Sequence, residues 1–284
     1  MQELSLVFFT VLAQGTVGLF LVLACLLMAN SETNRQQLLN KLLMVVLVLL
    51  GIAGAAAMTH LGQPLHAINV IFGLQHLSAL SVEIMTTALF GGAVFTYVAM
   101  VHFGILAKLQ KLVLAGAMGL GVLLLLAIAN VYTLATVPAW NSGWTIFQFV
   151  MTAFVVGIPA AALMLRSQSA TLGAFQKAYQ ERVDRALATL GFITLGLVLV
   201  CYPLYLFWLG QVDLPANPLG LFDYHGSLML ARLGLLFAGL GIWVIAATRG
   251  NNSAVGLAAV STVLVLTAEL CGRIFFYDLH LLPM

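Results

Sequence analysis

The sequence contains very little charge. Of its 284 residues only 7% are Asp, Glu, Lys or Arg, whereas 62% are hydrophobic and the mean hydropathy is +1.09. Soluble globular proteins carry about 25% charged residues, and disordered chains are polar and highly charged, so both classes are excluded. The net charge of +2 leaves no basic patch that could neutralise nucleic-acid phosphates. These numbers predict a polytopic membrane protein.

The sequence also lacks the usual motifs of metal and nucleotide sites. Its cysteines, Cys25, Cys201 and Cys271, lie in separate apolar runs without a Cys-x-x-Cys pair, and no Walker A loop is present. The histidines do not suit a membrane haem, because His60 and His102 end their spans at opposite membrane faces. We therefore expect no metal site, haem or iron–sulfur cluster in this chain.

Long apolar runs occupy most of the chain. A membrane-spanning helix needs about 20 mostly apolar residues. On that basis we predict an all-α bundle of eight transmembrane helices that forms one integral membrane domain over 1–284. The expected spans are 5–29, 42–60, 79–101, 112–132, 145–165, 186–210, 227–247 and 254–276.

The distribution of basic residues predicts the orientation. Nine of the eleven Lys and Arg residues fall in or beside the odd-numbered connections, and none falls in the even-numbered ones. By the positive-inside rule the odd connections face the cytoplasm. Both termini are then expected on the outer, periplasmic side of a bacterial inner membrane, in a multi-pass protein. The nine residues are Arg35, Lys41, Lys108, Lys111, Arg166, Lys177, Arg182, Arg185 and Arg249.

A few ionisable residues lie inside the spans, where each costs about 2.5–3.5 kcal/mol on insertion scales. Glu83, Arg232, Glu269 and Arg273 are inside, and His60 ends the second span. Counting 1.5 Å per residue places Glu83 and Arg232 about 6–8 Å below the outer end. All five therefore point to one half-buried polar pocket that opens outward. Glu269 and Arg273 are four residues apart, so we also expect an ion pair between them.

The connection after His60 belongs to the same predicted pocket. Gly62 and Pro64 favour a turn that fixes the direction of the His60 imidazole, and His66 and Asn69 follow. An imidazole titrates near pH 6.5, so His60 is suited to accept or pass a proton.

Aromatic and small residues give two further expectations. The rings at the outer helix ends are expected to act as interfacial anchors. Glycines in two helices are expected to form close helix–helix contacts. The anchors are Tyr132, Trp140, Trp144, Tyr205, Trp208 and Tyr277, and the small residues are Gly51, Gly54, Ala55, Gly116, Gly119 and Gly121.

Seven segments in order resemble one known family, the membrane-anchor subunits of the dimethyl sulfoxide reductase family. The segments are Phe9–Gln14, His60-Leu61-Gly62-x-Pro64 with Asn69, Ser78–Glu83, Thr136-Val137-Pro138-x-Trp140, Asp223-Tyr224 with Gly226–Met229, Glu269-x-x-Gly272-Arg273, and Phe276-Tyr277-x-Leu279-His280.

This resemblance implies a role in anaerobic respiration and electron transport. It implies an eight-helix subunit that oxidises menaquinol or another quinol without acting on the terminal substrate. His60 and Glu83 would serve the quinol site. Electrons would pass to an iron–sulfur subunit and then to a molybdopterin catalytic subunit, both docked on the outer face.

The residues themselves fit quinol chemistry, which needs a proton acceptor and a group that polarises the other quinone oxygen. In this hypothesis His60 accepts a proton, Glu83 orients it or passes the proton outward, and Arg232 or Arg273 polarises the oxygen. The expected quinol-binding residues are His60, Gly62, Pro64, His66, Asn69, Glu83, Arg232, Glu269, Arg273 and Tyr277.

Three alternatives remain open from the sequence. The chain could anchor a related polysulfide, thiosulfate or nitrite reductase that also uses quinol. The chain could also be a secondary transporter, but that class would show inverted halves and ionisable residues near the midplane, and neither stands out in this sequence. A purely structural anchor would not explain the costly residues at one depth.

Overall fold

The computed structural model describes residues 4–30, 33–59, 78–168, 174–212, 221–248 and 253–279. All regular structure in these ranges is helical. The helices are α1 (Leu4–Met28), α2 (Thr33–Met58), α3 (Ala79–His102), α4 (Ala107–Val131), α5 (Gly143–Ser167), α6 (Ala174–Leu209), α7 (Leu221–Thr248) and α8 (Ser253–Asp278).

Each of these eight helices is long and apolar enough to cross a membrane. The prediction of an all-helical, multi-pass membrane protein with eight spans is therefore confirmed for the part of the chain that is described. Four helices begin at least five residues earlier than expected: α2 at Thr33, α4 at Ala107, α6 at Ala174 and α7 at Leu221. Polar residues such as Gln36 and Glu181 favour helix, so the helix continues beyond the apolar segment that identifies it.

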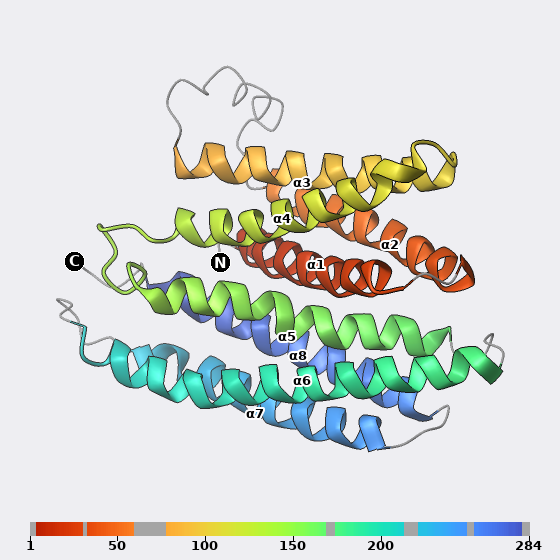
Figure 1. Cartoon of the computed structure of the whole chain (residues 1–284). Coiled ribbons are helices and arrows are strands. Elements are labelled where there is room, and N and C mark those ends of the chain that lie inside the picture. The colour runs from red at the N-terminus through yellow and green to blue at the C-terminus, as the bar shows by residue number, and fades with distance from the viewer. Residues whose placement is uncertain are drawn as a thin grey trace.

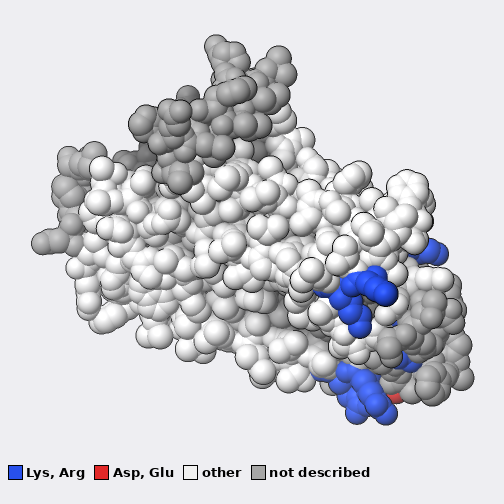
Figure 2. Space-filling view, turned by 45° about the horizontal axis from the view of Figure 1, so that its top comes forward, with Lys and Arg blue, Asp and Glu red and all other residues white. Residues whose placement is uncertain are grey.

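The helices run alternately up and down the bundle, so α1 begins and α8 ends at the same end (Figure 1). On the face shown in Figure 2, Lys and Arg gather at the opposite end. This agrees with the predicted segregation of basic residues to the odd-numbered connections. We refer below to the end where α1 begins as the terminal end of the bundle.

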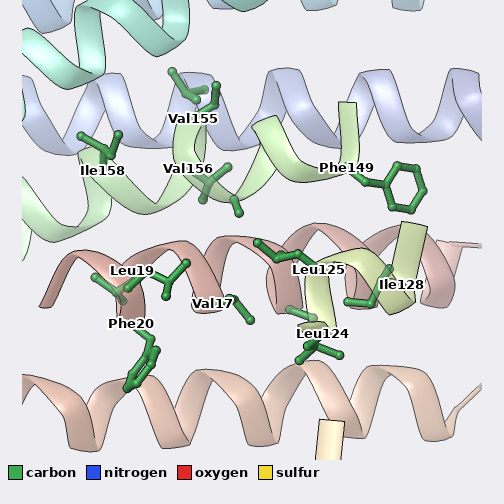
Figure 3. Packing of buried hydrophobic residues seen from close by; sticks show 14 of the residues in the cluster. Val17, Leu19, Phe20, Leu124, Leu125, Ile128, Phe149, Val155, Val156 and Ile158 are labelled. Atoms are coloured by element: carbon green, nitrogen blue, oxygen red, sulfur yellow. The ribbon is translucent and has the colours of Figure 1, made fainter. Parts of the chain in front are cut away.

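Helix α1 lies at the centre of the fold. It packs against α2, α4, α5 and α8, and most of its residues are buried. Its side chains meet those of α4 and α5 in the hydrophobic core, and Phe20 contacts Phe90 of α3 edge to face at 5.2 Å. Figure 3 shows part of this packing, with Val17, Leu19, Phe20, Leu124, Leu125, Ile128, Phe149, Val155, Val156 and Ile158.

A close helix contact joins α1 and α5 at glycines that the sequence analysis did not single out. A Cβ atom on Gly18 would overlap the main-chain oxygen of Ala153, and one on Gly157 would lie 2.5 Å from the Leu19 nitrogen. The expectation for Gly51, Gly54, Gly116 and Gly119 is wrong, because a Cβ there would meet nothing within 4 Å. Only Gly121 of that set is tightly packed, 3.2 Å from Phe90 and Val17.

Replacing Gly18 by alanine is expected to destabilise the protein by about 1–3 kcal/mol, because α1 and α5 must move apart. Thermal unfolding of the full chain in detergent measures the effect. Gly54→Ala is the matched control, since the added methyl group meets open space and improves helix propensity. Equal stabilities of the two variants would contradict the close contact.

Candidate functional site

Four ionisable side chains are buried in the half of the bundle nearer its terminal end. Glu83, Arg232, Glu269 and Arg273 are each no more than 4% exposed. At 1.5 Å per residue, Glu83 lies about 6 Å and Arg273 about 8 Å from the nearest helix end. Glu269 lies about 14 Å and Arg232 about 16 Å from theirs. Arg232 is deeper than expected because α7 begins at Leu221.

Arg232 and Glu269 form a buried ion pair between α7 and α8. The Arg232 Nη2 atom lies 3.1 Å from Glu269 Oε1, and its Nη1 atom donates to Gln148 Oε1 of α5 at 3.1 Å. The guanidinium also lies 4.3 Å from the centre of the Tyr202 ring, on α6. One arginine therefore joins four helices, and its charge is compensated by a carboxylate as a buried charge requires.

Arg273 is held by a different set of groups. Its Nη2 atom donates to Gln14 Oε1 of α1 at 2.7 Å and to the Thr152 hydroxyl at 3.2 Å, and its guanidinium lies 3.5 Å from the Phe149 ring centre. The expected ion pair with Glu269 is not formed, since Glu269 turns toward Arg232 and Arg273 toward α1. Thr152 links the two groups, because its hydroxyl also donates to Glu269 Oε2 at 2.6 Å.

The aromatic residues at the terminal end pack inside the bundle. Trp140 stacks on Phe276 at 5.2 Å and donates its indole N–H to the Phe276 carbonyl at 2.8 Å. The Tyr277 hydroxyl donates to that of Tyr132 at 2.6 Å. Tyr205 is also buried. The prediction that these rings are interfacial anchors is therefore wrong for Tyr132, Trp140, Tyr205 and Tyr277, which join helices to one another.

Glu83 lies apart from the Arg232–Glu269 pair. It makes no ion pair or hydrogen bond with either residue or with Arg273, and its Oε1 atom has no hydrogen-bond partner among the described residues. Glu83 instead lies near Tyr132, which is paired with Tyr277. Burial raises the pKa of the Tyr132 phenol, which follows α4, well above its usual range, and nearby Tyr277 and Glu83 add to the rise.

The structure therefore separates the predicted single pocket into two regions. One region contains Glu83 and the Tyr132–Tyr277 pair, and the other contains Arg232 and Glu269. Arg273 contacts the second region through Thr152, and its charge also acts on Tyr132. Five predicted residues lie outside the described residues: His60, Gly62, Pro64, His66 and Asn69.

Three neutral polar residues complete the charged network and were not predicted. Gln14, Gln148 and Thr152 supply the hydrogen bonds that connect α1 and α5 to the two arginines. A signal for two of them was present, because a glutamine inside an apolar span is costly unless it is hydrogen-bonded.

Two adjoining clefts flank the ion pair between α5, α6, α7 and α8. Aromatic side chains, including Trp144, Tyr202 and Tyr205, form much of the wall of the larger cleft, and its empty space is about 270 Å³ when the open solvent at its mouth is included. The smaller, about 200 Å³ by the same measure, extends past Gly272 to Arg273. Gln148, Arg232 and Glu269 line both clefts. The described residues contain no group of three or more His, Cys, Asp or Glu side chains that could hold a metal ion.

Gly272 provides the space that Arg232 occupies. A Cβ atom on Gly272 would lie 2.5 Å from Arg232 Nε and 2.6 Å from Cζ. We expect Gly272→Ala to displace the guanidinium and lower stability by about 1–3 kcal/mol, measured by thermal unfolding in detergent. Gly256→Ala is the control on the same helix, because its added methyl group meets nothing within 4 Å. If Gly272→Ala unfolds no earlier than this control, Arg232 does not need the space.

These features define a multi-pass integral membrane protein that holds a charged, hydrogen-bonded centre between its helices. Comparison with known proteins gives the family: the chain belongs to the DMSO reductase anchor subunits (DmsC), whose family pattern matches residues 1–279. It is 34% identical over 284 residues to the C chain of the anaerobic dimethyl sulfoxide reductase of Escherichia coli (strain K12), covering 99% of this chain and 96% of the relative. This confirms the resemblance seen in the sequence.

Two further relatives match over similar lengths. The YnfH chain of an anaerobic dimethyl sulfoxide reductase from the same E. coli strain is 32% identical, with 99% of this chain and 95% of the relative covered. The C chain of the Haemophilus influenzae enzyme is 29% identical, with 99% and 96% covered.

Proposed function

We propose that this chain anchors a molybdoenzyme reductase in a bacterial inner membrane and oxidises menaquinol or another quinol near the outer leaflet. Family membership together with the buried Glu83 carboxylate supports this role. The carboxylate lies about 6 Å from the end of α3 with its Oε1 atom unpartnered among the described residues. Quinol oxidation requires a proton acceptor, and a buried carboxylate with an unpartnered oxygen can serve as one.

The reaction releases two protons and two electrons as the quinol becomes a quinone. His60 accepts a proton from the hydroxyl, and Glu83 orients His60 or passes the proton outward. Gly62, Pro64, His66 and Asn69, which follow His60 in the chain, are the further quinol-binding residues expected from the sequence. Of the two arginines, Arg273 is the better placed to polarise the far oxygen, because its charge acts on the Tyr132–Tyr277 pair beside Glu83.

The two electrons pass to an iron–sulfur subunit and then to a molybdopterin catalytic subunit that reduces the terminal substrate. These partners dock at the terminal end of the bundle, which the positive-inside rule places outside. Because quinol entry and proton release are then on the same side, turnover alone moves no charge across the membrane.

The assembled complex provides the test. The full chain is purified from its membranes with whatever subunits accompany it, and reduction of their iron–sulfur clusters by a short-chain quinol is followed spectroscopically. Rapid reduction that requires this chain is the expected result. Clusters that are reduced equally fast after the chain is removed would contradict the proposal. The identity of the catalytic subunit also separates dimethyl sulfoxide reduction from polysulfide, thiosulfate or nitrite reduction.

A further inference from the structure

The connection between α4 and α5 has an exposed, uncharged and largely apolar surface. It covers residues 132–142 and lies at the terminal end of the bundle (Figure 1). Leu134 is 42% exposed, and Ala135, Thr136 and Pro138 are also exposed. No residue of the connection is Asp, Glu, Lys, Arg or His. The segment 136–140, which contributes to the family resemblance, belongs to this connection, and the quinol chemistry gives it no role.

The hydrocarbon core of the membrane does not account for this surface. The connection consists of turns, in which the Val137 N–H donates to the Leu134 carbonyl at 3.0 Å and the Trp140 N–H donates to the Val137 carbonyl at 2.9 Å. Irregular main chain of this kind does not face lipid tails, which cannot satisfy its free polar groups. The connection therefore lies at or beyond the membrane surface. Apolar area exposed to water there costs about 25 cal/mol per Å².

The packing beneath the connection holds it in one conformation. Trp140 donates its indole N–H to the Phe276 carbonyl at 2.8 Å, and its own carbonyl accepts from the Thr145 hydroxyl at 2.6 Å. Ala139 is 1% exposed, so the side of the connection that faces the bundle is closely covered. A surface that is already ordered loses little conformational entropy on binding, which favours its use as a contact.

The connection is continuous with the groups proposed for quinol oxidation. It begins at Tyr132, which accepts a hydrogen bond from Tyr277 at 2.6 Å and lies near Glu83. The Trp140 ring meets the Tyr132 ring edge to face at 5.7 Å. Electron transfer slows steeply with distance, so the subunit that accepts the electrons must contact the bundle close to this region.

We propose that residues 134–138 form a contact for the iron–sulfur subunit, which places the electron acceptor beside the quinol region. The choice of this partner rests on the proposed function. The surface that binds residues 134–138 is itself uncharged and mainly apolar, because the connection offers no charge to pair and the cores of protein interfaces are depleted in charged residues.

Site-specific photo-cross-linking in the complete complex tests this contact. A photoreactive amino acid replaces Thr136, and the cross-linked partner is identified by mass spectrometry and by its iron–sulfur content. We expect a cross-link to the iron–sulfur subunit. The same amino acid at Ile105 is the control, because Ile105 is 49% exposed in the connection between α3 and α4, at the opposite end of the bundle. It should give no cross-link to that subunit.

A matched pair of variants measures the strength of the contact. Leu134→Glu places a charge in the proposed interface, and the complex should retain the iron–sulfur subunit about 10-fold less well in mild detergent, since an unpaired charge would be buried. Ile105→Glu makes a similar change at the opposite end and should retain the subunit fully. Both variants should unfold at the wild-type temperature, because both side chains are exposed. If Leu134→Glu is itself unstable, the Thr136 cross-link decides.

The inference is overturned if the probe at Thr136 reaches only phospholipid, the catalytic subunit or a second copy of this chain. It is also overturned if a stable Leu134→Glu variant retains the iron–sulfur subunit as well as Ile105→Glu does.

This contact and the proposed quinol oxidation can fail independently. A cross-link to the iron–sulfur subunit, with clusters that quinol does not reduce, would reject quinol oxidation and retain the contact. Normal quinol-dependent cluster reduction in a Leu134→Glu complex that keeps its iron–sulfur subunit would reject the contact alone.

Discussion

Replacing Glu83 by glutamine is expected to slow quinol oxidation by the assembled complex about 100-fold or more, because general acid–base catalysis contributes about 10²–10⁴ in rate. The amide has nearly the same shape as the carboxylate but cannot accept the proton. No described side chain hydrogen-bonds to Glu83 Oε1, so little structure is lost with the charge. The measurement is quinol-dependent reduction of the terminal acceptor, normalised to the amount of assembled complex.

Glu181→Gln is the matched control for this experiment. It makes the same chemical change at an exposed position near the start of α6. Its rate should equal that of the wild type. A wild-type rate in Glu83→Gln would defeat the assignment, and failure to assemble would instead assign Glu83 a structural role.

The second large effect is expected at the buried ion pair. Glu269→Gln should destabilise the protein by about 3–5 kcal/mol, because it leaves the Arg232 charge buried without its counterion. Unfolding of the full chain in detergent, followed by circular dichroism, measures the loss.

A double variant distinguishes the cost of the uncompensated charge from the loss of the other contacts that the two side chains make. Arg232→Met combined with Glu269→Gln removes both charges, so it should be more stable than Glu269→Gln alone. The difference between the single and double variants measures the cost of the uncompensated charge. If the single variant loses less than about 1 kcal/mol, water or another group reaches Arg232 and the pair is not the main compensation.

The eight spans could be predicted from the sequence because membrane insertion depends on length and apolar content, which are local properties. Burial of Glu83, Arg232, Glu269 and Arg273 followed from their positions within those spans. The helix starts were less predictable, because polar residues such as Gln36 continue a helix into water.

The partners of the buried charges could not be predicted in the same way. The spacing of Glu269 and Arg273 favours a pair on one helix, but Arg232 reaches Glu269 across the space left by Gly272. Arg273 then finds Gln14, which is 259 residues away in the chain. Such contacts depend on which helices become neighbours, and a periodic pattern within one helix does not contain that information.

The same limit explains why the prediction of interfacial aromatic anchors was wrong for most of these residues. Trp140 lies in the connection between α4 and α5, and Tyr277 lies in the last turn of α8, where rings commonly anchor a membrane protein. Only the fold shows that Phe276 stacks on Trp140 and that Tyr132 contacts Tyr277. The glycines were mispredicted for the same reason. The sequence does not reveal that Gly18 packs against α5, whereas a Cβ atom on Gly51 would meet nothing within 4 Å.

The hydrogen bond from Arg273 to Gln14 joins the last helix to the first, and this has a consequence for biosynthesis. Helix α1 enters the membrane long before α8 has been translated. Until then the Gln14 amide is without its native arginine and α1 lacks part of its packing surface. A chain that stops before α8 also leaves Arg232 without Glu269. The polar centre therefore closes only when translation is complete, so a truncated or stalled chain keeps exposed the groups by which membrane quality control could recognise it.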